Sequence, residues 1–327
     1  MTTRPPVACL GAGRMARGIA VVFAYAGHDV TIVDVKPRDA AGYAETAMAA
    51  LAEVRDTLAT LAGFGLIPQA AVAAISARVQ VLAEVDATGA LGAAAVIFEG
   101  VPEVLALKRE VLARASRLAG PAPIIASTTS TILVDDIAGA VEHPGRFLNA
   151  HWLNPAFLVP LVELSPGGAT DPAVTTRLKA LLESIGKVPV VCAATPGYIV
   201  PRIQALAMNE AARMVEEGVA SAEDIDKAIK YGFGVRFATL GMLEFIDWGG
   251  GDILYYASRY LTAALASDRY AAPEIVERNM AAGRIGLKTG QGFLDYDNRD
   301  LDVYRRERLQ AFVGLLAHLG MTRPPVL

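Results

Sequence analysis

Cysteine, long apolar stretches and excess positive charge are all scarce in this sequence of 327 residues. Its two cysteines, Cys9 and Cys192, lie far apart in apolar, strand-like segments, so we expect two buried, reduced thiols. Because neither a CxxC nor an HExxH motif occurs, we expect no metal site. No apolar stretch reaches the roughly 18 residues of a membrane span, so we expect no membrane partner.

The charge balance is slightly acidic, with 30 Lys and Arg against 34 Asp and Glu. This balance argues against a nucleic-acid partner and favours a small-molecule substrate. The first apolar segment is followed at once by a glycine turn rather than by a cleavage site, so we expect a cytoplasmic location. The length of the chain predicts two domains.

The first residues show the pattern of a dinucleotide-binding unit. Residues 6–10 are apolar and predict a strand, a glycine-rich turn occupies 11–18, and 19–25 continue as a helix. A second apolar segment at 29–35 predicts the next strand. Strand, glycine turn, helix and strand within about 30 residues are the context that the dinucleotide fingerprint requires. The alternative is a glycine-rich turn that binds nothing.

Each residue of the turn has a physical role in this interpretation. Gly11 permits the tight turn, Gly13 lets the backbone approach a pyrophosphate, and Ala16 stands at the helix-packing position. The free N–H groups and the dipole of the helix start favour the phosphates. We expect Arg14 and Met15, at the same turn, to contact the cofactor as well.

The cofactor is expected to be NAD. Asp34 ends the second predicted strand, 23 residues after Gly11, where a carboxylate accepts hydrogen bonds from the ribose hydroxyls and repels a 2′-phosphate. Lys36 and Arg38 follow closely and act against that discrimination.

Strands and helices continue to alternate after this unit. Such alternation predicts an α/β fold with a parallel, Rossmann-type doubly wound sheet, in which ligands bind beyond the carboxyl ends of the strands. The polar residues at 99–103 and 127–130 follow two such ends. We expect an Ala-rich helical hairpin over 40–83, interrupted at 63–68, strands over 79–82, 94–99 and 124–126, and a helix over 104–118.

His151 is the candidate for acid–base chemistry. It lies between a predicted strand and an Asn-Pro turn, and Glu163 follows twelve residues later on a strand expected over 158–164. Oxidation of a secondary alcohol needs a group that accepts the hydroxyl proton, and the ordinary pKa of histidine suits this role. A carboxylate on the second nitrogen would fix the tautomer. The spacing alone leaves open a core histidine and an unrelated glutamate.

At these residues the sequence resembles the 3-hydroxyacyl-CoA dehydrogenase family over nearly its whole length. The resemblance implies an NAD-binding Rossmann-type domain over 1–194 and an all-α domain over 195–327 that usually forms a homodimer. It also implies NAD-dependent interconversion of a 3-hydroxy acyl compound and its 3-oxo form, as in fatty acid metabolism. The motifs are GAGRMARGIA at 11–20, EGVPEVLALK at 99–108, STTS at 127–130, HWLNP at 151–155, PLVEL at 160–164, TPGYIV at 195–200 and GLKTGQGF at 286–293.

The resemblance assigns roles by motif. His151 matches the family's base and Glu163 its orienting partner. Ser130 and Asn154 match residues that contact the substrate and the nicotinamide. For Lys108 and Lys288 the alternative is a solvated charge. The further residues expected to contact the cofactor are Glu103, Lys108 and Lys288.

Two departures loosen the tie to coenzyme A. Pro201 replaces the asparagine of the family's TPGFxxNR motif, and it offers no side-chain hydrogen bond. It is tolerable only in the first turn of the following helix. In addition, the chain has no lysine between Lys36 and Lys108, where members that use coenzyme A carry a cationic patch.

A third departure points to another substrate. Arg236, within the altered segment 232–238, resembles the branch of the family that acts on small free hydroxy acids such as gulonate or carnitine. It could pair with a substrate carboxylate, or it could be a surface arginine. A non-catalytic dinucleotide-binding protein is a further alternative, but the joint presence of Ser130, His151, Asn154 and Glu163 argues against it.

Overall fold

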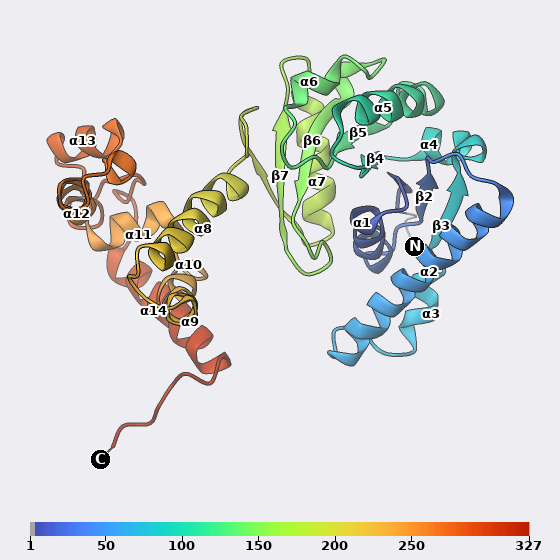
Figure 1. Ribbon diagram of the computed structural model, residues 1–327. Helices are drawn as coiled ribbons and strands as arrows, with labels where there is room; N and C mark the ends of the chain where they lie inside the picture. Colours follow the sequence, from blue (N-terminus) through green and yellow to red (C-terminus); the bar gives the residue numbers. More distant parts are fainter. Residues whose placement is uncertain (1–3, 327) are drawn as a thin grey trace. The chain divides into compact units, whose positions relative to one another are not determined.

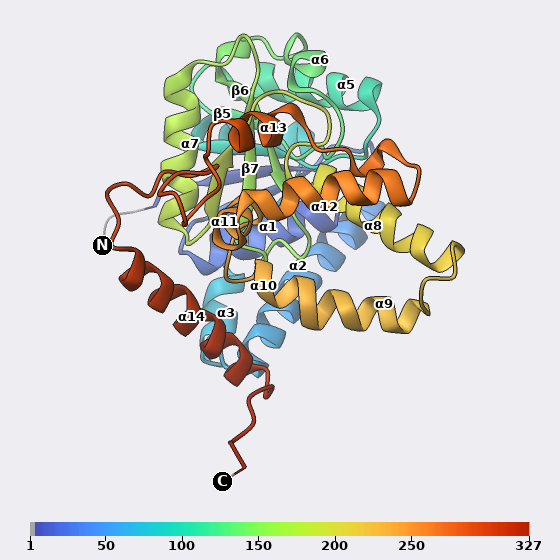
Figure 2. The same cartoon turned by 90° about the vertical axis from the view of Figure 1, so that its left-hand side faces the viewer.

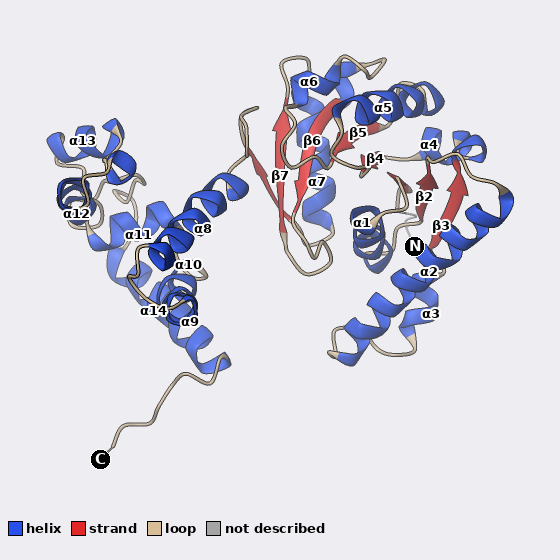
Figure 3. Ribbon diagram, in the orientation of Figure 1, coloured by secondary structure: helices blue, strands red, loops and turns tan. Residues whose placement is uncertain are grey.

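The computed structural model describes residues 4–326. The chain divides into two compact units, Met1–Ala207 and Met208–Leu327, and its course from blue to red can be followed in Figure 1. Figure 3 shows that the strands gather in the first unit.

The first unit is built on one eight-stranded sheet in the order β3-β2-β1-β4-β5-β6-β7-β8. All neighbouring strands are parallel except β6 and β7, which pair antiparallel. The predicted Rossmann-type doubly wound sheet is therefore confirmed. The strands are β1 (Val7–Leu10), β2 (Val30–Asp34), β3 (Val79–Ala83), β4 (Val96–Glu99), β5 (Ile124–Ser127), β6 (Phe147–Trp152), β7 (Leu161–Pro166) and β8 (Val188–Val191).

Helices cover both faces of the sheet, because successive side chains of a buried strand point to opposite sides. Val7 and Cys9 belong to the core on one face, and Ala8 and Leu10 to the core on the other. The first face is covered by α1 (Arg14–Tyr25), α2 (Ala40–Gly63), α3 (Ala71–Ser76) and α7 (Pro172–Ser184). The second is covered by α4 (Thr88–Ala93), α5 (Leu105–Ala119) and α6 (Val134–Ala138).

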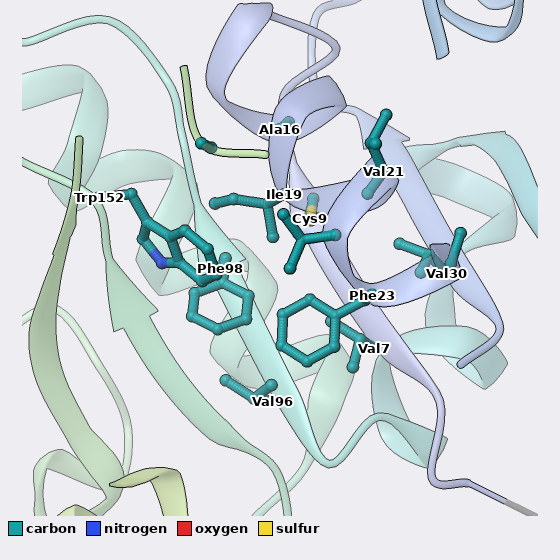
Figure 4. Close-up of a cluster of buried hydrophobic side chains, with 14 of the residues drawn as sticks. Val7, Cys9, Ala16, Ile19, Val21, Phe23, Val30, Val96, Phe98 and Trp152 are labelled. Atoms are coloured by element: carbon teal, nitrogen blue, oxygen red, sulfur yellow. The ribbon is translucent and has the colours of Figure 1, made fainter. Parts of the chain in front are cut away.

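Aromatic side chains fill the first face near the middle of the sheet (Figure 4). The rings of Phe98 and Trp152 meet edge to face at 5.5 Å between centroids, and Phe23 of α1 lies 5.6 Å from Phe98. These fully or almost fully buried rings fix α1 against β4 and β6. The glycine turn before α1 and the residues after β6 thereby gain a rigid support.

The second unit is helical, as expected, and its helices run from yellow to red in Figure 2. Ser221 caps α9 by accepting a hydrogen bond from the Asp224 N–H. The glycines at 249–251 separate α11 from α12, and Gly250 adopts a φ of 107°. The helices are α8 (Val200–Glu216), which starts in the first unit, α9 (Ala222–Ala228), α10 (Val235–Phe237), α11 (Met242–Gly249), α12 (Gly251–Ala264), α13 (Glu274–Ala281) and α14 (Leu301–His318).

Two local expectations were wrong. Cys192 is half-buried rather than buried, because it follows β8 at the edge of the sheet. The strand expected from residue 158 starts at Leu161, because the buried Lys187 holds the preceding loop through the carbonyls of Ala156 and Val159 at 2.6 and 2.7 Å. A domain boundary at residue 194 stays a prediction. None of the helices within residues 4–326 combines the length and the apolar composition needed to cross a bilayer.

Candidate active site

A large cavity lies at the carboxyl ends of the central strands of the first unit. Its volume is about 1020 Å³, comparable with the upper end, about 1,000 Å³, of ordinary ligand pockets. Gly11 forms its turn with a φ of 91°, and a Cβ there would stand 3.4 Å from the Gly100 carbonyl. A dinucleotide fits these residues, because glycines and a helix N-terminus meet the pyrophosphate. Of the predicted cofactor contacts, the cavity is lined by Gly11, Gly13, Arg14, Met15, Asp34, Glu103, Lys108 and Asn154.

Asp34 ends β2 at the edge of this cavity and is buried. The Arg38 guanidinium donates to Asp34 Oδ2 over 2.6 Å, and the Lys36 main-chain N–H lies 3.3 Å from Oδ1. Each carboxylate oxygen keeps a second lone pair, so the group can still accept from ribose hydroxyls. Recognition of the ribose by Asp34 stays a prediction.

Lys108 is almost completely buried, which contradicts the alternative of a solvated charge. Its ammonium group lies 2.9 and 3.1 Å from the two oxygens of Glu99, and 3.1 Å from the Val101 carbonyl. Glu99 also accepts from the Ser127 hydroxyl over 2.5 Å. Sequence reasoning missed Glu99. The signal was a glutamate closing an apolar strand, where a buried charge needs a partner.

Glu103 organises the loop that carries Ser130. Its Oε1 accepts from the Ser130 N–H over 3.1 Å and from both the N–H and the hydroxyl of Thr131 over 3.0 and 2.9 Å, and it also bonds to the Thr129 hydroxyl. Partial burial alone would raise the pKa of Glu103, but these hydrogen bonds and the Lys108 charge outweigh it and lower the pKa to about 2. Glu103 is therefore a carboxylate at neutral pH, and Ser130 stays exposed at the loop.

His151 and Glu163 face each other directly across the antiparallel pair β6·β7. This register puts both side chains on one face of the sheet, and His151 Nδ1 lies 2.8 Å from Glu163 Oε2. The second oxygen of Glu163 accepts from the N–H groups of Ile199 and Val200 over 2.9 and 2.8 Å. Burial would raise the pKa of Glu163, but the His151 hydrogen bond and the two N–H groups lower it. The predicted His–Glu pair is thus present in the geometry.

Sequence reasoning also missed Tyr198. Its ring is stacked on His151, with centroids 5.0 Å apart and planes 9° from parallel. Nothing local in the sequence marks this contact, because the two residues are 47 positions apart and meet only when the segment after β8 folds back. Pro201 lies in the first turn of α8, as predicted, where the helix makes no hydrogen bond that would need an N–H from this residue.

Two predicted site residues belong to the second unit. Lys288 is exposed in the turn after α13, and Arg236 is exposed on α10. The Arg236 guanidinium lies 5.6 Å from the centre of the Phe245 ring. Their roles toward the cofactor and the substrate stay predictions.

Two family models match successive parts of the chain. The model for the NAD-binding domain of 3-hydroxyacyl-CoA dehydrogenase matches residues 6–195, and the model for the C-terminal domain of that family matches residues 197–296. Together the two matches take in both the sheet and most of the helical unit.

Individual relatives cover most of the chain. A 5-formyl-3-hydroxy-2-methylpyridine 4-carboxylate 5-dehydrogenase of Mesorhizobium japonicum is 30% identical over 311 residues, 94% of this chain and 96% of that protein. A probable 3-hydroxybutyryl-CoA dehydrogenase of Bacillus subtilis is 31% identical over 289 residues, 88% of this chain and 96% of that protein. The crystal structure of a 3-hydroxyacyl-CoA dehydrogenase from Archaeoglobus fulgidus covers 98% of this chain and 100% of its own, at 31% identity and a TM-score of 0.77. The chain therefore belongs to the 3-hydroxyacyl-CoA dehydrogenase family, as an NAD-dependent oxidoreductase that acts on a CH–OH group.

Proposed function

We propose that His151 is the general base that takes the hydroxyl proton when this enzyme oxidises a 3-hydroxy substrate. The observation that supports this role is the 2.8 Å contact between His151 Nδ1 and Glu163. His151 also lies three residues before Asn154, which lines the cofactor cavity. With Nδ1 held by a carboxylate, Nε2 is the nitrogen that exchanges a proton with the substrate. The carboxylate also stabilises the imidazolium that forms.

The other residues position the substrate. Bound NAD supplies the hydride acceptor. The Ser130 hydroxyl donates a hydrogen bond to the substrate oxygen, and Glu103 holds its loop through three neighbouring donors, the N–H groups of Ser130 and Thr131 and the Thr131 hydroxyl. Asn154 lines the cavity at its nicotinamide end in this proposal. The oxygen is thus held between two groups whose positions are set by carboxylates, the buried Glu163 and the more exposed Glu103.

His151→Gln tests the assignment. The variant should lose at least about 10³-fold in kcat, because no group remains to accept the proton. It should still bind NADH, measured by quenching of protein fluorescence. His143→Gln is the matched control, because His143 is exposed in a loop before Pro144. Normal turnover by the His151 variant would remove the proposed base.

The preferred substrate is a 3-hydroxyacyl-CoA thioester, as the names of several relatives suggest. A small free hydroxy acid is the second candidate. It is favoured by Arg236 and by the groove along α2, which carries Glu53 and Asp56 but no lysine. One of the relatives acts on a free pyridine carboxylate by its name. A panel of thioesters and free acids, assayed by NADH absorbance, separates the two.

Arg236→Ala refines that assay. If the substrate is a free acid whose carboxylate pairs with Arg236, the variant should raise KM at least about tenfold, the usual effect of losing a charged hydrogen bond. Arg306→Ala is the control, because Arg306 is also exposed in the second unit. An unchanged KM for every free acid would reject this role and leave the dehydrogenase assignment intact.

We also propose a homodimer that works in the cytoplasm. The support for the dimer is the many large apolar side chains exposed on the helical unit, among them Met208, Tyr256 and Tyr260. The support for the location is that Cys9 and Cys192 are both free thiols. Sedimentation velocity at several protein concentrations tests the dimer, and a monomer throughout would contradict it.

A further inference from the structure

Tyr198 lies at the point where three elements of the proposed site meet. It follows β8, stacks on the His151 ring of β6 and is almost completely buried. The next two residues, Ile199 and Val200, donate their N–H groups to Glu163. One short segment therefore contacts both members of the proposed His–Glu pair.

The ring of Tyr198 limits the movement of His151. Glu163 fixes Nδ1 in the plane of the imidazole, but a single hydrogen bond leaves the ring free to rotate about it. The Tyr198 ring, 5.0 Å away and within 9° of parallel, covers one face of the imidazole. The two contacts together determine both the direction and the plane of Nε2.

The hydroxyl of Tyr198 reaches the loop of Ser130. It donates to the Thr129 carbonyl over 2.8 Å and accepts from the Asn149 amide over 3.1 Å. Thr129 immediately precedes Ser130, and its carbonyl belongs to the peptide bond between these two residues. The hydroxyl therefore connects the Ser130 loop to the same side chain that covers His151.

The backbone supports a specific role for this residue. Tyr198 has a φ of 46°, in the left-handed region that a bulky side chain rarely adopts. Such a conformation is kept only when the surroundings hold it, and residues of this kind cluster at functional sites. Here the holding contacts are the stacked ring and the two hydrogen bonds of the hydroxyl.

We propose that Tyr198 is a positioning residue that couples the base His151 to the substrate-binding Ser130 loop, its ring acting on His151 and its hydroxyl on Ser130. This inference deepens the proposed function and depends on it. Tyr198 touches neither substrate nor cofactor in the proposal. Its two parts act on different partners, so they can be separated by substitution.

Two variants separate ring from hydroxyl. Tyr198→Phe keeps the stacked ring but loses both hydrogen bonds of the hydroxyl, and it should lower kcat/KM about five- to tenfold, mainly through the lost bond to the Thr129 carbonyl. Tyr198→Leu loses both the ring and the hydroxyl and should lower kcat about 10²-fold or more, because His151 is no longer held in its plane. NADH affinity should be unchanged in both. Recovery of most of kcat by phenylalanine relative to leucine is the signature of the ring.

Tyr43→Phe is the matched control for the lost hydroxyl. The Tyr43 hydroxyl also donates to a main-chain carbonyl, that of Val81, over 2.8 Å in the same unit, away from His151. Both phenylalanine variants should lose thermal stability, and Tyr198→Phe somewhat more, because its hydroxyl makes two hydrogen bonds. Only Tyr198→Phe should lose activity.

A double-mutant cycle with Ser130→Ala tests the coupling. Adding Tyr198→Phe to Ser130→Ala should cost less than about twofold in kcat/KM. The Tyr198 hydroxyl acts through the Ser130 side chain, which Ser130→Ala has already removed. Adding Tyr198→Leu should still cost at least tenfold through His151. Fully additive losses with phenylalanine, or a leucine variant with normal kcat, would overturn the proposal. If His151→Gln also kept its activity, the proposed base itself would fail instead.

Discussion

Glu163 contacts two separate parts of the site. One oxygen orients His151, and the other accepts the N–H groups at the start of α8. Both oxygens are therefore occupied, and the carboxylate cannot turn without losing a bond at each end. Glu163 therefore supplies both the orientation of His151 and the negative charge beside it.

Glu163→Gln should separate these two effects. An amide can still accept from Ile199 and Val200, but it removes the negative charge beside His151 and can present N–H₂ to Nδ1. We expect kcat to fall at least about 10²-fold, as for a histidine base held in the wrong tautomer. Steady-state kinetics at saturating substrate measure this loss, with Glu183→Gln on the exposed end of α7 as the control. A kcat within threefold of the parent would contradict the orienting role.

Lys108 is the second residue whose removal should be costly. Lys108→Met leaves Glu99 buried without its cation, and breaking a buried pair costs about 3–5 kcal/mol. Urea denaturation measures the free energy of unfolding of the first unit. Lys179→Met is the control, because the Lys179–Glu183 pair is solvent-exposed and such pairs contribute about 0–1 kcal/mol. Equal stability of the two variants would show that the buried pair contributes nothing.

At this scale the sequence predicted what motifs and charges can predict. His151, Glu163 and Ser130 were identified as candidates from their residue types and motif context. Tyr198 was missed because its contact with His151 spans 47 residues, which no local pattern encodes. Glu99 was missed although it closes an apolar strand, because its pairing with Lys108, nine residues later, was not inferred. Lys108 was identified, but its burial against Glu99 was not.

At the scale of elements, β2 brings a carboxylate and a guanidinium together at its end. Asp34→Ala removes the acceptor expected for the ribose hydroxyls and frees Arg38 from its 2.6 Å contact. We expect weaker NADH binding and a preference shifted toward NADPH, because a free arginine favours a 2′-phosphate. Titration with both cofactors measures the ratio of the two dissociation constants. Asp29→Ala, exposed before the start of β2, should leave that ratio unchanged. An unchanged ratio for Asp34→Ala would remove Asp34 from cofactor selection.

Most elements were predictable because their periodicity is strong. The alternation of buried strands and amphipathic helices gave the doubly wound sheet, and Pro201 marked a helix start correctly. The loop before β7 was predicted as strand because its residues are apolar. Lys187, 28 and 31 residues away from the carbonyls that it binds, holds that loop away from the sheet.

At the scale of the whole molecule, several groups whose pKa is lowered in the folded state affect stability with the same sign. Burial lowers the pKa of His28 below its ordinary 6.5, and burial lowers that of Lys187 from 10.5 to about 8. Hydrogen bonds and the Lys108 charge lower the pKa of Glu103 from 4.5 to about 2 against the effect of its partial burial. In each case the unfolded chain binds more protons over the interval between the two pKa values, so stability falls as pH falls through it.

We therefore expect the free energy of unfolding to decrease from pH 7 to pH 5 and to decrease further below pH 4.5. His28→Gln should flatten the part just below pH 6.5, where one histidine contributes at most about 1.4 kcal/mol per pH unit. His143→Gln, at an exposed site, should keep the original slope. Denaturant titrations at pH 7, 6, 5 and 4 measure these slopes. A parent protein that gains stability toward pH 5 would refute the sign.

The register of β6 and β7 also has an evolutionary consequence. His151 and Glu163 are paired by the ladder itself, and the residues at 153–160, which include the cavity-lining Asn154, connect the two strands. Insertions or deletions after Asn154 would leave the pair facing each other, provided that two carbonyls remain for Lys187. The chemistry and the neighbouring loop could therefore diverge independently. Related enzymes could acquire new substrates by exchanging the part of this connection after Asn154 while retaining the facing pair His151 and Glu163.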